Sequence, residues 1–290
     1  TGGGNQFLRA LKKNFKFKNL YTEDPSLADI ILFNSHQEIE QVLSLRQALS
    51  GKAKFVHRID GPMRLYNKMS DERDLIAYQL NNLCADAAIF QSEWSRDANL
   101  QLGLNLGNKQ CAVICNAVDD TIFNENRKEK VGQKIKLIAS SWSNNIKKGF
   151  DTYKYLDETL DFEKYDFAFM GRTPHDFNNI RCLGALRTEQ VAENLRNSDI
   201  FITASENDPC SNSLIEALNC KVPAIALRSG GHPEIIKKGG LLFEQNQDII
   251  NKIEELCDNY MNYKNNIETT TISQVVDKYL SFFKVLLKEV

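Results

Sequence analysis

Short apolar runs alternate with helical stretches along this chain, and the alternation occurs twice. Apolar runs lie at 28–33, 54–57, 87–91, 135–140, 166–171, 180–184, 199–204 and 222–227, and a further run ends at Ile114. Helical spacing of apolar residues lies between them, as in 70–84 and in the stretches that begin at Phe150, Thr188 and Ser213. Strands that alternate with helices build parallel sheets from βαβ units. The pattern therefore predicts an α/β protein with two domains of similar size.

The length of the chain and a polar interruption between its halves agree with two domains. The chain has 290 residues, and a domain has roughly 150 residues. The stretch 124–134 is polar and charged, so we expect it to be the linker. The tail 271–290 places its apolar side chains on one face. This predicts an amphipathic helix that docks on the protein, with a helix on a membrane surface as the alternative.

Charge and cysteine usage exclude several classes of protein. The 36 Lys and Arg are balanced by 38 Asp and Glu, so no global positive field is available to hold nucleic acid. The seven cysteines lack the C-x-x-C spacing of a zinc site. No apolar run approaches the roughly 18 residues needed to cross a bilayer. We expect a cytoplasmic protein with reduced thiols and without a metal or a nucleic-acid partner.

The first residues have the pattern of a loop that opens a helix. Gly2, Gly3 and Gly4 precede the helical spacing of 5–17, and a helix N-terminus after glycines suits an anion. No Met begins the chain, so we expect that a strand precedes Thr1. The same helix carries a basic cluster that could touch an anionic acceptor or the inner face of a membrane, unless it is a solvated face. This cluster consists of Arg9, Lys12, Lys13, Lys16 and Lys18.

The densest group of polar residues follows the apolar run 199–204. Asp208 and Glu216 stand eight positions apart, and a helix begins between them. Backbone N–H groups at that helix start suit a diphosphate, and the carboxylates suit sugar hydroxyls. A nucleotide sugar has both needs. The alternative is that Ser213-x-x-Glu216 is a capping box that satisfies only its own helix.

This segment resembles the E-x7-E region of retaining, family 4 glycosyltransferases. Other segments resemble motifs of that family in the family's order. They are Gly2-Gly3-Gly4 for the glycine loop, Asn116-Ala117-Val118-Asp119 with Phe123 for the link N-G-V-D-x-x-x-F, Lys148-Gly149 for the phosphate motif and Gly230-Gly231-His232-Pro233-Glu234 for G-G-x-P-E. Together they span nearly the whole chain.

The resemblance implies the GT-B fold, in which two Rossmann-like domains face each other across a cleft. An acceptor domain of residues 1–118 is expected, with 272–290 packed back on it, and a donor domain of residues 119–271. The implied activity (EC 2.4) moves a sugar from a nucleotide-diphosphate sugar to a hydroxyl acceptor, with retention and without a metal or cofactor. UDP- or GDP-linked donors and glycan, lipid-linked or small-molecule acceptors of glycan or glycoconjugate biosynthesis are the expected partners.

The resemblance also implies roles for single residues. Lys148 would stabilise the leaving diphosphate, Asp208 would grip hydroxyls of the donor sugar and His57 would orient that sugar, and these three are the expected catalytic residues. Arg58 and Asp60 are weaker candidates on the acceptor side. The expected donor-binding residues are Gly3, Gly4, Trp142, Ser143, Gly171, Arg172, Glu206, Cys210, Ser211, Asn212, Ser213, Leu214 and Glu216.

Each of these roles has a plainer alternative. Lys148 and Arg172 would then be solvated side chains, His57 would be a core histidine, and Arg58 and Asp60 would pair with each other. The chain also departs from the family motifs. Asp208 replaces the first Glu, Pro209-Cys210-Ser211 replaces G-F-G, and Trp142 stands where the family has an Arg. Glu206 could therefore make the sugar contact instead of Asp208.

Four other functions compete with a GT-B transferase. A metal-dependent, single-domain glycosyltransferase would need a D-x-D motif, which the chain lacks. A sugar-nucleotide epimerase shares the GT-B architecture but uses no acceptor. A non-catalytic module would bind a nucleotide sugar without turnover. A dehydrogenase is the weakest alternative because the first glycines have no G-x-G-x-x-G continuation.

Overall fold

The computed structural model describes residues 3–126 and 133–288 and contains two parallel-sheet α/β units. One unit comprises Phe7–Ala117 and the C-terminal helix, and the other comprises Val118–Thr271 together with the residues up to Gln6. The predicted division placed these first residues in the other domain. Most of the expected linker, residues 127–132, lies outside the described residues, as does Gly2.

The first unit is built on a four-stranded sheet of order β1-β2-β3-β4, in which all pairs are parallel. Its strands are β1 (Ile30–Asn34), β2 (Lys54–Ile59), β3 (Ala87–Phe90) and β4 (Gln110–Val113). Its helices are α1 (Gly3–Phe17), η1 (Pro25–Leu27), α2 (Ile39–Ala48), α3 (Met63–Tyr66), α4 (Arg73–Cys84), α5 (Glu93–Gln101) and α12 (Ile272–Lys288). The sequence predicted these four strands and helices α1, α4 and α12 within a few residues, whereas α2 and α5 were not predicted.

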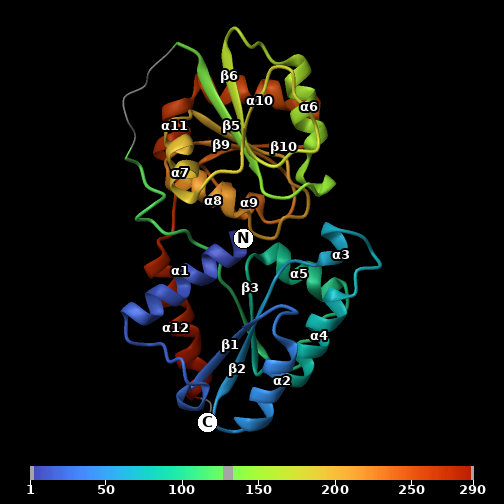
Figure 1. The fold of residues 1–290 in the computed structure, drawn as a ribbon, viewed down its shortest axis with the longest axis vertical. Coiled ribbons are helices and arrows are strands. Elements are labelled where there is room, and N and C mark those ends of the chain that lie inside the picture. The colour runs from blue at the N-terminus through green and yellow to red at the C-terminus, as the bar shows by residue number, and fades with distance from the viewer. Residues whose placement is uncertain (1–2, 127–132, 289–290) are drawn as a thin grey trace. The chain divides into compact units, whose positions relative to one another are not determined.

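Apolar side chains cover both faces of this sheet. Val56 and Ile89 pack against Phe7 and Leu11 of α1 and Tyr279 of α12 on one face. The opposite face packs against α2, α4 and α5, as Figure 1 shows for these helices. The amphipathic tail is therefore a docking helix of this unit, as predicted, and its apolar stripe is buried in the core.

The second unit is built on a six-stranded parallel sheet of order β10-β9-β8-β5-β6-β7. Its strands are β5 (Ile135–Ser141), β6 (Tyr165–Gly171), β7 (Arg181–Gly184), β8 (Ile200–Thr203), β9 (Ala224–Leu227) and β10 (Gly240–Phe243). Its helices are η2 (Ile146–Lys148), α6 (Phe150–Thr159), α7 (Thr188–Arg196), α8 (Asn212–Asn219), α9 (His232–Ile236), α10 (Asn246–Asp258) and α11 (Tyr260–Asn265).

The core of the second unit lies between this sheet and helices α6 and α10. Leu137, Phe167 and Ile202 of the sheet pack with Tyr153 of α6 and Ile253 of α10, and all five are buried. The central residues of β5, β6 and β8 are apolar on both sides of each strand because helices cover both faces of the sheet. Within the described residues, no helix has both the length and the apolar character to cross a membrane.

Candidate functional site

The strand order of the second unit contains one point at which the direction of the chain reverses. From β5 the chain proceeds outward to β6 and β7, and from β8 it proceeds outward on the other side to β9 and β10. The loops after the neighbouring strands β5 and β8 therefore leave the sheet in opposite directions. Ligands of open α/β sheets bind at such a switch point, beyond the carboxyl ends of the strands.

The loop after β5 is held in shape by its own serine and asparagine side chains. Ser141 Oγ donates to the Ser143 carbonyl at 2.7 Å, and Asn145 Oδ1 accepts from the Lys147 N–H at 2.9 Å. Gly149 then caps α6 with a φ of +71°. A Cβ at Gly149 would lie 2.2 Å from the Ala204 carbonyl oxygen, so this position needs glycine. The loops after β5 and β8 are thus in direct contact.

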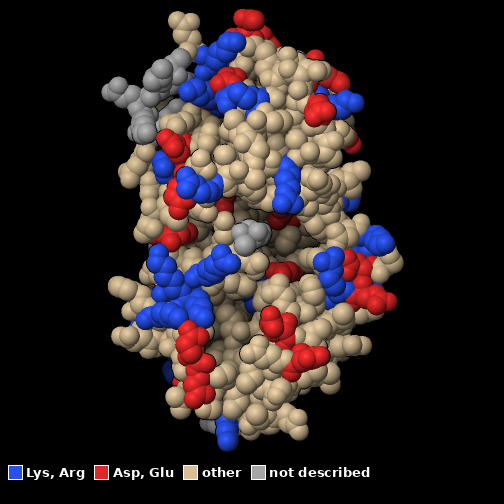
Figure 2. Space-filling view, viewed as in Figure 1, with Lys and Arg blue, Asp and Glu red and all other residues tan. Residues whose placement is uncertain are grey.

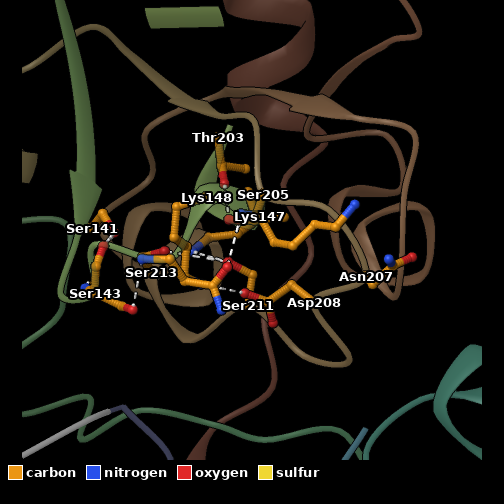
Figure 3. A network of polar contacts seen from close by, with 12 residues as sticks. Ser141, Ser143, Lys147, Lys148, Thr203, Ser205, Asn207, Asp208, Ser211 and Ser213 are labelled. Atoms are coloured by element: carbon orange, nitrogen blue, oxygen red, sulfur yellow. Dashed lines mark hydrogen bonds and ion pairs between the residues drawn. The ribbon is translucent and has the colours of Figure 1, made fainter. Parts of the chain in front are cut away.

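The loop after β8 is tied to its neighbours on both sides. The Glu206 N–H donates to the Lys147 carbonyl at 2.7 Å, and the Asn207 N–H donates to Ser229 Oγ at 2.9 Å. Gly230 approaches the Asp208 backbone so closely that a Cβ would lie 2.2 Å from the Asp208 carbonyl oxygen. Three segments far apart in the sequence therefore meet at one place, as Figure 3 shows for the labelled residues of the first two.

An ion pair joins the loops after β5 and β8 at this place. Lys148 Nζ lies 3.1 Å from Asp208 Oδ2, and the two side chains are only 18% and 14% exposed. Burial would raise the pKa of Asp208, but the charge of Lys148, followed by that of His232, lowers it below its usual value. The Cys210 N–H also donates to Asp208 Oδ1 at 3.2 Å. Lys148 is therefore not the freely solvated lysine of the plainer alternative.

Glu216 lies in the middle of α8 and is buried. Burial raises the pKa of Glu216 to about 8, well above its usual value of 4.5. The N-cap of α8 is Ser211, whose Oγ accepts from the Leu214 N–H at 3.4 Å. The capping box of Ser213 and Glu216 is therefore not formed, because the helix begins two residues earlier than that motif requires. Asn212, Ser213 and Leu214 form the first turn of α8.

The other predicted donor-binding residues lie in or near the same loops. Glu206 pairs with Lys147, which leaves Asp208 as the partner of Lys148. Trp142 and Ser143 follow β5, and Gly171 ends β6 with a φ of +98°. Arg172 donates its N–H to the Ser141 carbonyl at 2.7 Å, but its side chain is exposed.

Gly3 and Gly4 do not form the expected loop, since α1 already begins at Gly3. Gly3 and Gly4 instead lie in the first turn of α1, where backbone N–H groups have no partner within the helix, and their contact with the donor stays a prediction.

His232 lies at this site and had no predicted role. Its Nδ1 lies 2.8 Å from the Leu227 carbonyl, and its ring is fully buried. Burial lowers the pKa of His232, while the charge of Asp208 opposes this shift. The sequence could have pointed to His232, because it occupies the variable position of the G-G-x-P-E motif.

The predicted catalytic histidine lies in the first unit and has the contacts of a core residue. His57 Nε2 lies 2.9 Å from the Ser35 carbonyl, and Asn81 Nδ2 lies 3.3 Å from His57 Nδ1. Phe33 stacks on the imidazole with the ring centroids 4.3 Å apart. The side chain is 0% exposed, and burial lowers its pKa to about 4. This is the environment of a core histidine, which was the alternative to a catalytic role.

Arg58 and Asp60 pair with each other, as their alternative expected. Arg58 Nη1 lies 2.9 Å from Asp60 Oδ1, and Arg58 is 1% exposed. A direct contact of Arg58 with an acceptor does not fit this burial. Asp60 remains 28% exposed.

The basic cluster of α1 is partly neutralised by its own surroundings. Lys12 and Lys16 pair with Glu23, and both ammonium groups lie over the Tyr21 ring. Lys18 pairs with Asp277 of α12. Figure 2 shows these basic side chains gathered over α1 with acidic side chains beside them. The cluster thus has the contacts of a solvated helix face.

Part of the chain matches a known family of proteins. Residues 177–272 match the model of glycosyl transferases group 1, and this segment includes Asp208 and Glu216. Protein 356 of Sulfolobus islandicus rod-shaped virus 1 is 25% identical over 229 residues, which is 64% of each chain. The O-antigen biosynthesis glycosyltransferase WbnH of Escherichia coli is 28% identical over 95 residues, or 32% of this chain and 28% of that protein. The chain thus matches less than two thirds of the length of these relatives.

Solved structures resemble the chain over nearly its whole length. Sucrose-phosphate synthase from Thermosynechococcus elongatus has a TM-score of 0.72 at 15% identity, over 98% of this chain and 79% of that one. Anabaena HepE in complex with UDP and glucose has a TM-score of 0.70 at 14% identity, over 94% of this chain and 80% of that one. The chain therefore has the pair of Rossmann-like domains of GT-B glycosyltransferases.

Proposed function

We propose that this protein is a retaining, family 4-like glycosyltransferase that takes its sugar from a nucleoside-diphosphate donor. The observation that carries the proposal is the Lys148–Asp208 ion pair at the switch point of the six-stranded sheet. The match of residues 177–272 to glycosyl transferases group 1 supports it independently. UDP is the donor nucleotide we favour, because HepE, a GT-B neighbour, was solved with UDP.

We assign one role to each of Lys148, Asp208 and Glu216. Lys148 would leave Asp208 to bind the diphosphate, on which negative charge builds as the anomeric carbon–oxygen bond breaks. Asp208 would then accept hydrogen bonds from hydroxyls of the donor sugar. Glu216 would accept hydrogen bonds from the ribose hydroxyls. These hydroxyls would replace the water molecules that burial excludes from the carboxylate.

The transfer step that we propose retains the configuration at the anomeric carbon. The acceptor oxygen forms its bond to that carbon on the face that the diphosphate leaves. The leaving oxygen takes the bonding electron pair and receives the proton of the acceptor hydroxyl. A fixed positive charge at Lys148 would stabilise the diphosphate without a divalent cation, and turnover that persists in EDTA would support this assignment.

A panel of UDP and GDP sugars tests the function directly. We expect one of them to stabilise the protein thermally, by about 2.7 kcal/mol at a concentration of about 100 times Kd. Hydrolysis of that sugar donor should fall by about 100-fold in Lys148→Ala, since a charge-assisted contact of about 2.7 kcal/mol is lost.

Lys147→Ala is the matched control and should stay within about threefold of the wild type, since this lysine pairs with Glu206 on the exposed side. If no nucleotide or nucleotide sugar stabilises the protein, the proposed function is wrong. Binding without any turnover would instead indicate a non-catalytic module, and conversion of the donor into another nucleotide sugar would indicate an epimerase.

A further inference from the structure

A buried histidine of the second unit has a hydrogen-bonding capacity that the roles assigned above leave unused. His232 is the first residue of α9 and directly follows the segment 228–231 after β9. This segment is bound to the loop after β8, because the Gly231 N–H donates to the Asp208 carbonyl at 2.9 Å. The backbone that carries His232 is therefore fixed beside that of Asp208.

One hydrogen bond determines which ring nitrogen of His232 carries a proton. Nδ1 lies 2.8 Å from the Leu227 carbonyl, and a carbonyl can only accept, so Nδ1 is the protonated nitrogen. Burial lowers the pKa of His232, so the ring is neutral at pH 7 and Nε2 keeps its lone pair. His232 thus presents a hydrogen-bond acceptor at a fixed place.

This acceptor has no donor of its own. Nε2 has no hydrogen-bond partner among the described residues, and the side chain is 0% exposed. A buried acceptor without a donor destabilises a fold, so such a group calls for a partner. The charges of Asp208 and Lys148 both act on the ring, so it lies close to the ion pair shown in Figure 3.

Only one part of a nucleotide sugar suits Nε2. The diphosphate is ionised at pH 7 and has no proton to donate, and in the proposed function it binds Lys148. The ribose hydroxyls are assigned to Glu216. The hydroxyls of the donor sugar remain, and they are neutral donors that approach Asp208. The movement of Lys148 from Asp208 to the diphosphate opens space for them beside the segment that carries His232.

We propose that His232 is a specificity-determining residue, whose Nε2 accepts a hydrogen bond from a hydroxyl of the donor sugar. The sugar then needs two free hydroxyls near each other, one that donates to Asp208 and one that donates to His232. This assignment rests on the proposed transferase function and narrows its class of donors. The family motif G-G-x-P-E leaves the position of His232 variable, so the resemblance implies no such role.

Two amide variants separate this contact from a structural role of the ring. In His232→Asn the amide N–H can replace Nδ1–H at the Leu227 carbonyl, but no acceptor reaches the position of Nε2. In His232→Gln the longer side chain places an acceptor near that position, and the bond to Leu227 is lost. The proposed contact and a structural role therefore predict opposite orders of the two variants.

Calorimetry with UDP and with the tightest-binding sugar of the UDP panel measures the contribution of the sugar, as the ratio of the two dissociation constants. We expect this contribution to fall about fivefold in His232→Asn, the loss of about one neutral hydrogen bond, and to stay within about twofold in His232→Gln. Thermal stability should show the reverse order. UDP affinity should stay within about twofold in both variants, which also shows that they are folded.

Deoxy analogues of the same UDP sugar test the contact from the side of the ligand. Removal of the hydroxyl that donates to Nε2 should weaken binding to the wild type about fivefold. It should not weaken binding to His232→Asn, because both changes remove the same hydrogen bond. Removal of any other hydroxyl should weaken binding to both proteins equally.

Three results would overturn the assignment. They are an unchanged contribution of the sugar in His232→Asn, a larger loss in His232→Gln than in His232→Asn, and deoxy analogues that all lose the same affinity for both proteins. Failure of the proposed function is read separately in the wild type, because it appears as the absence of UDP binding, and the assignment would fail with it.

Discussion

Glu216 is a carboxyl group whose burial has a measurable consequence for ligand binding. Its pKa of about 8 means that it is mostly protonated at pH 7 in the nucleotide-free protein. Ribose hydroxyls that donate to the carboxylate would favour its ionised form and lower this pKa. Nucleotide binding below pH 8 should therefore release a proton, and UDP affinity should rise with pH by up to about tenfold per unit until pH 8.

Calorimetry of UDP binding at pH 7 and pH 9, in buffers of different ionisation enthalpy, measures both effects. Glu216→Gln cannot ionise and should bind UDP with the same affinity at both values of pH. An unchanged proton release in this variant would show that another group titrates, and it would remove Glu216 from the nucleotide site.

The burial of His57 predicts a pH dependence of stability that distinguishes a core histidine from a ligand-facing one. In the folded protein the pKa of His57 is about 4, whereas the ordinary value is 6.5. Between these values the unfolded chain takes up a proton that the folded chain does not. The free energy of unfolding should therefore fall as the pH falls from 6.5 to 4, by about 1.4 kcal/mol per unit from this residue.

Urea unfolding at pH 6.5 and pH 5 tests this, with His57→Gln as the comparison. We expect the wild type to lose about 2 kcal/mol more than the variant over this interval. NMR titration of the ring gives the pKa itself. An ordinary pKa near 6.5 would mean that the imidazole is hydrated, and the contact with Ser35 and Asn81 would then be wrong.

The sequence named the separate residues of the proposed donor site but not their contacts. Asp208 was singled out because it lies in the polar segment that follows an apolar run, and Lys148 because Lys148-Gly149 resembles a phosphate motif. Their ion pair spans 60 positions in the chain, so it depends on the two strands being neighbours in the sheet. The sequence also did not show which polar residues are buried. Burial raises the pKa of Glu216 to about 8 and lowers that of His57 to about 4.

At the scale of elements, most strands were predictable because the central residues of a strand covered on both faces are apolar. Strand β10 was missed, since no apolar run was predicted at Gly240–Phe243. The residues at which strands and helices begin were predicted less accurately. The run 222–227 contains Pro223, which cannot donate to the sheet, and β9 begins only at Ala224. Similarly α8 begins at Asn212, because the hydroxyl of Ser211 is the one that caps the helix. The order of the six strands results from long-range packing, which local periodicity does not encode.

Helix α12 is the element whose packing is most directly testable. Tyr279 is 0% exposed and meets the rings of Phe15 and Phe283 edge-on, at centroid distances of 6.5 and 5.9 Å. Tyr279→Ala should lower the free energy of unfolding of this unit by about 3–5 kcal/mol, as for other large aromatic side chains in cores. Leu287→Ala, on the same helix but 40% exposed, should cost less than about 1 kcal/mol.

Fluorescence resolves this unit from the other, because the two tryptophans lie in different units. Trp94 lies in α5 and Trp142 follows β5. In a Trp142→Phe background, urea unfolding reports on the unit that contains α12. Equal effects of the two substitutions would show that α12 is not docked through Tyr279.

At the scale of the whole molecule, the proposed donor site divides the two units into one that binds the nucleotide and one that does not. Lys148, Asp208 and Glu216 all belong to residues 118–271. They lie in the loops after β5 and β8 and in α8, so the proposed nucleotide site needs no residue of the four-stranded sheet. A nucleotide alone should therefore order only the donor site.

Hydrogen exchange measured by mass spectrometry tests this division. Saturating UDP should slow amide exchange in 142–149 and 204–216, the loops after β5 and β8, because the nucleotide stabilises the conformation that it binds. Residues 59–64, which end and follow β2 in the other unit, should exchange as before. In Lys148→Ala the UDP-dependent protection should be reduced in both loops, whereas Lys147→Ala should leave it intact. Protection by UDP that appears first in 59–64 would place the nucleotide on the wrong sheet and contradict the division.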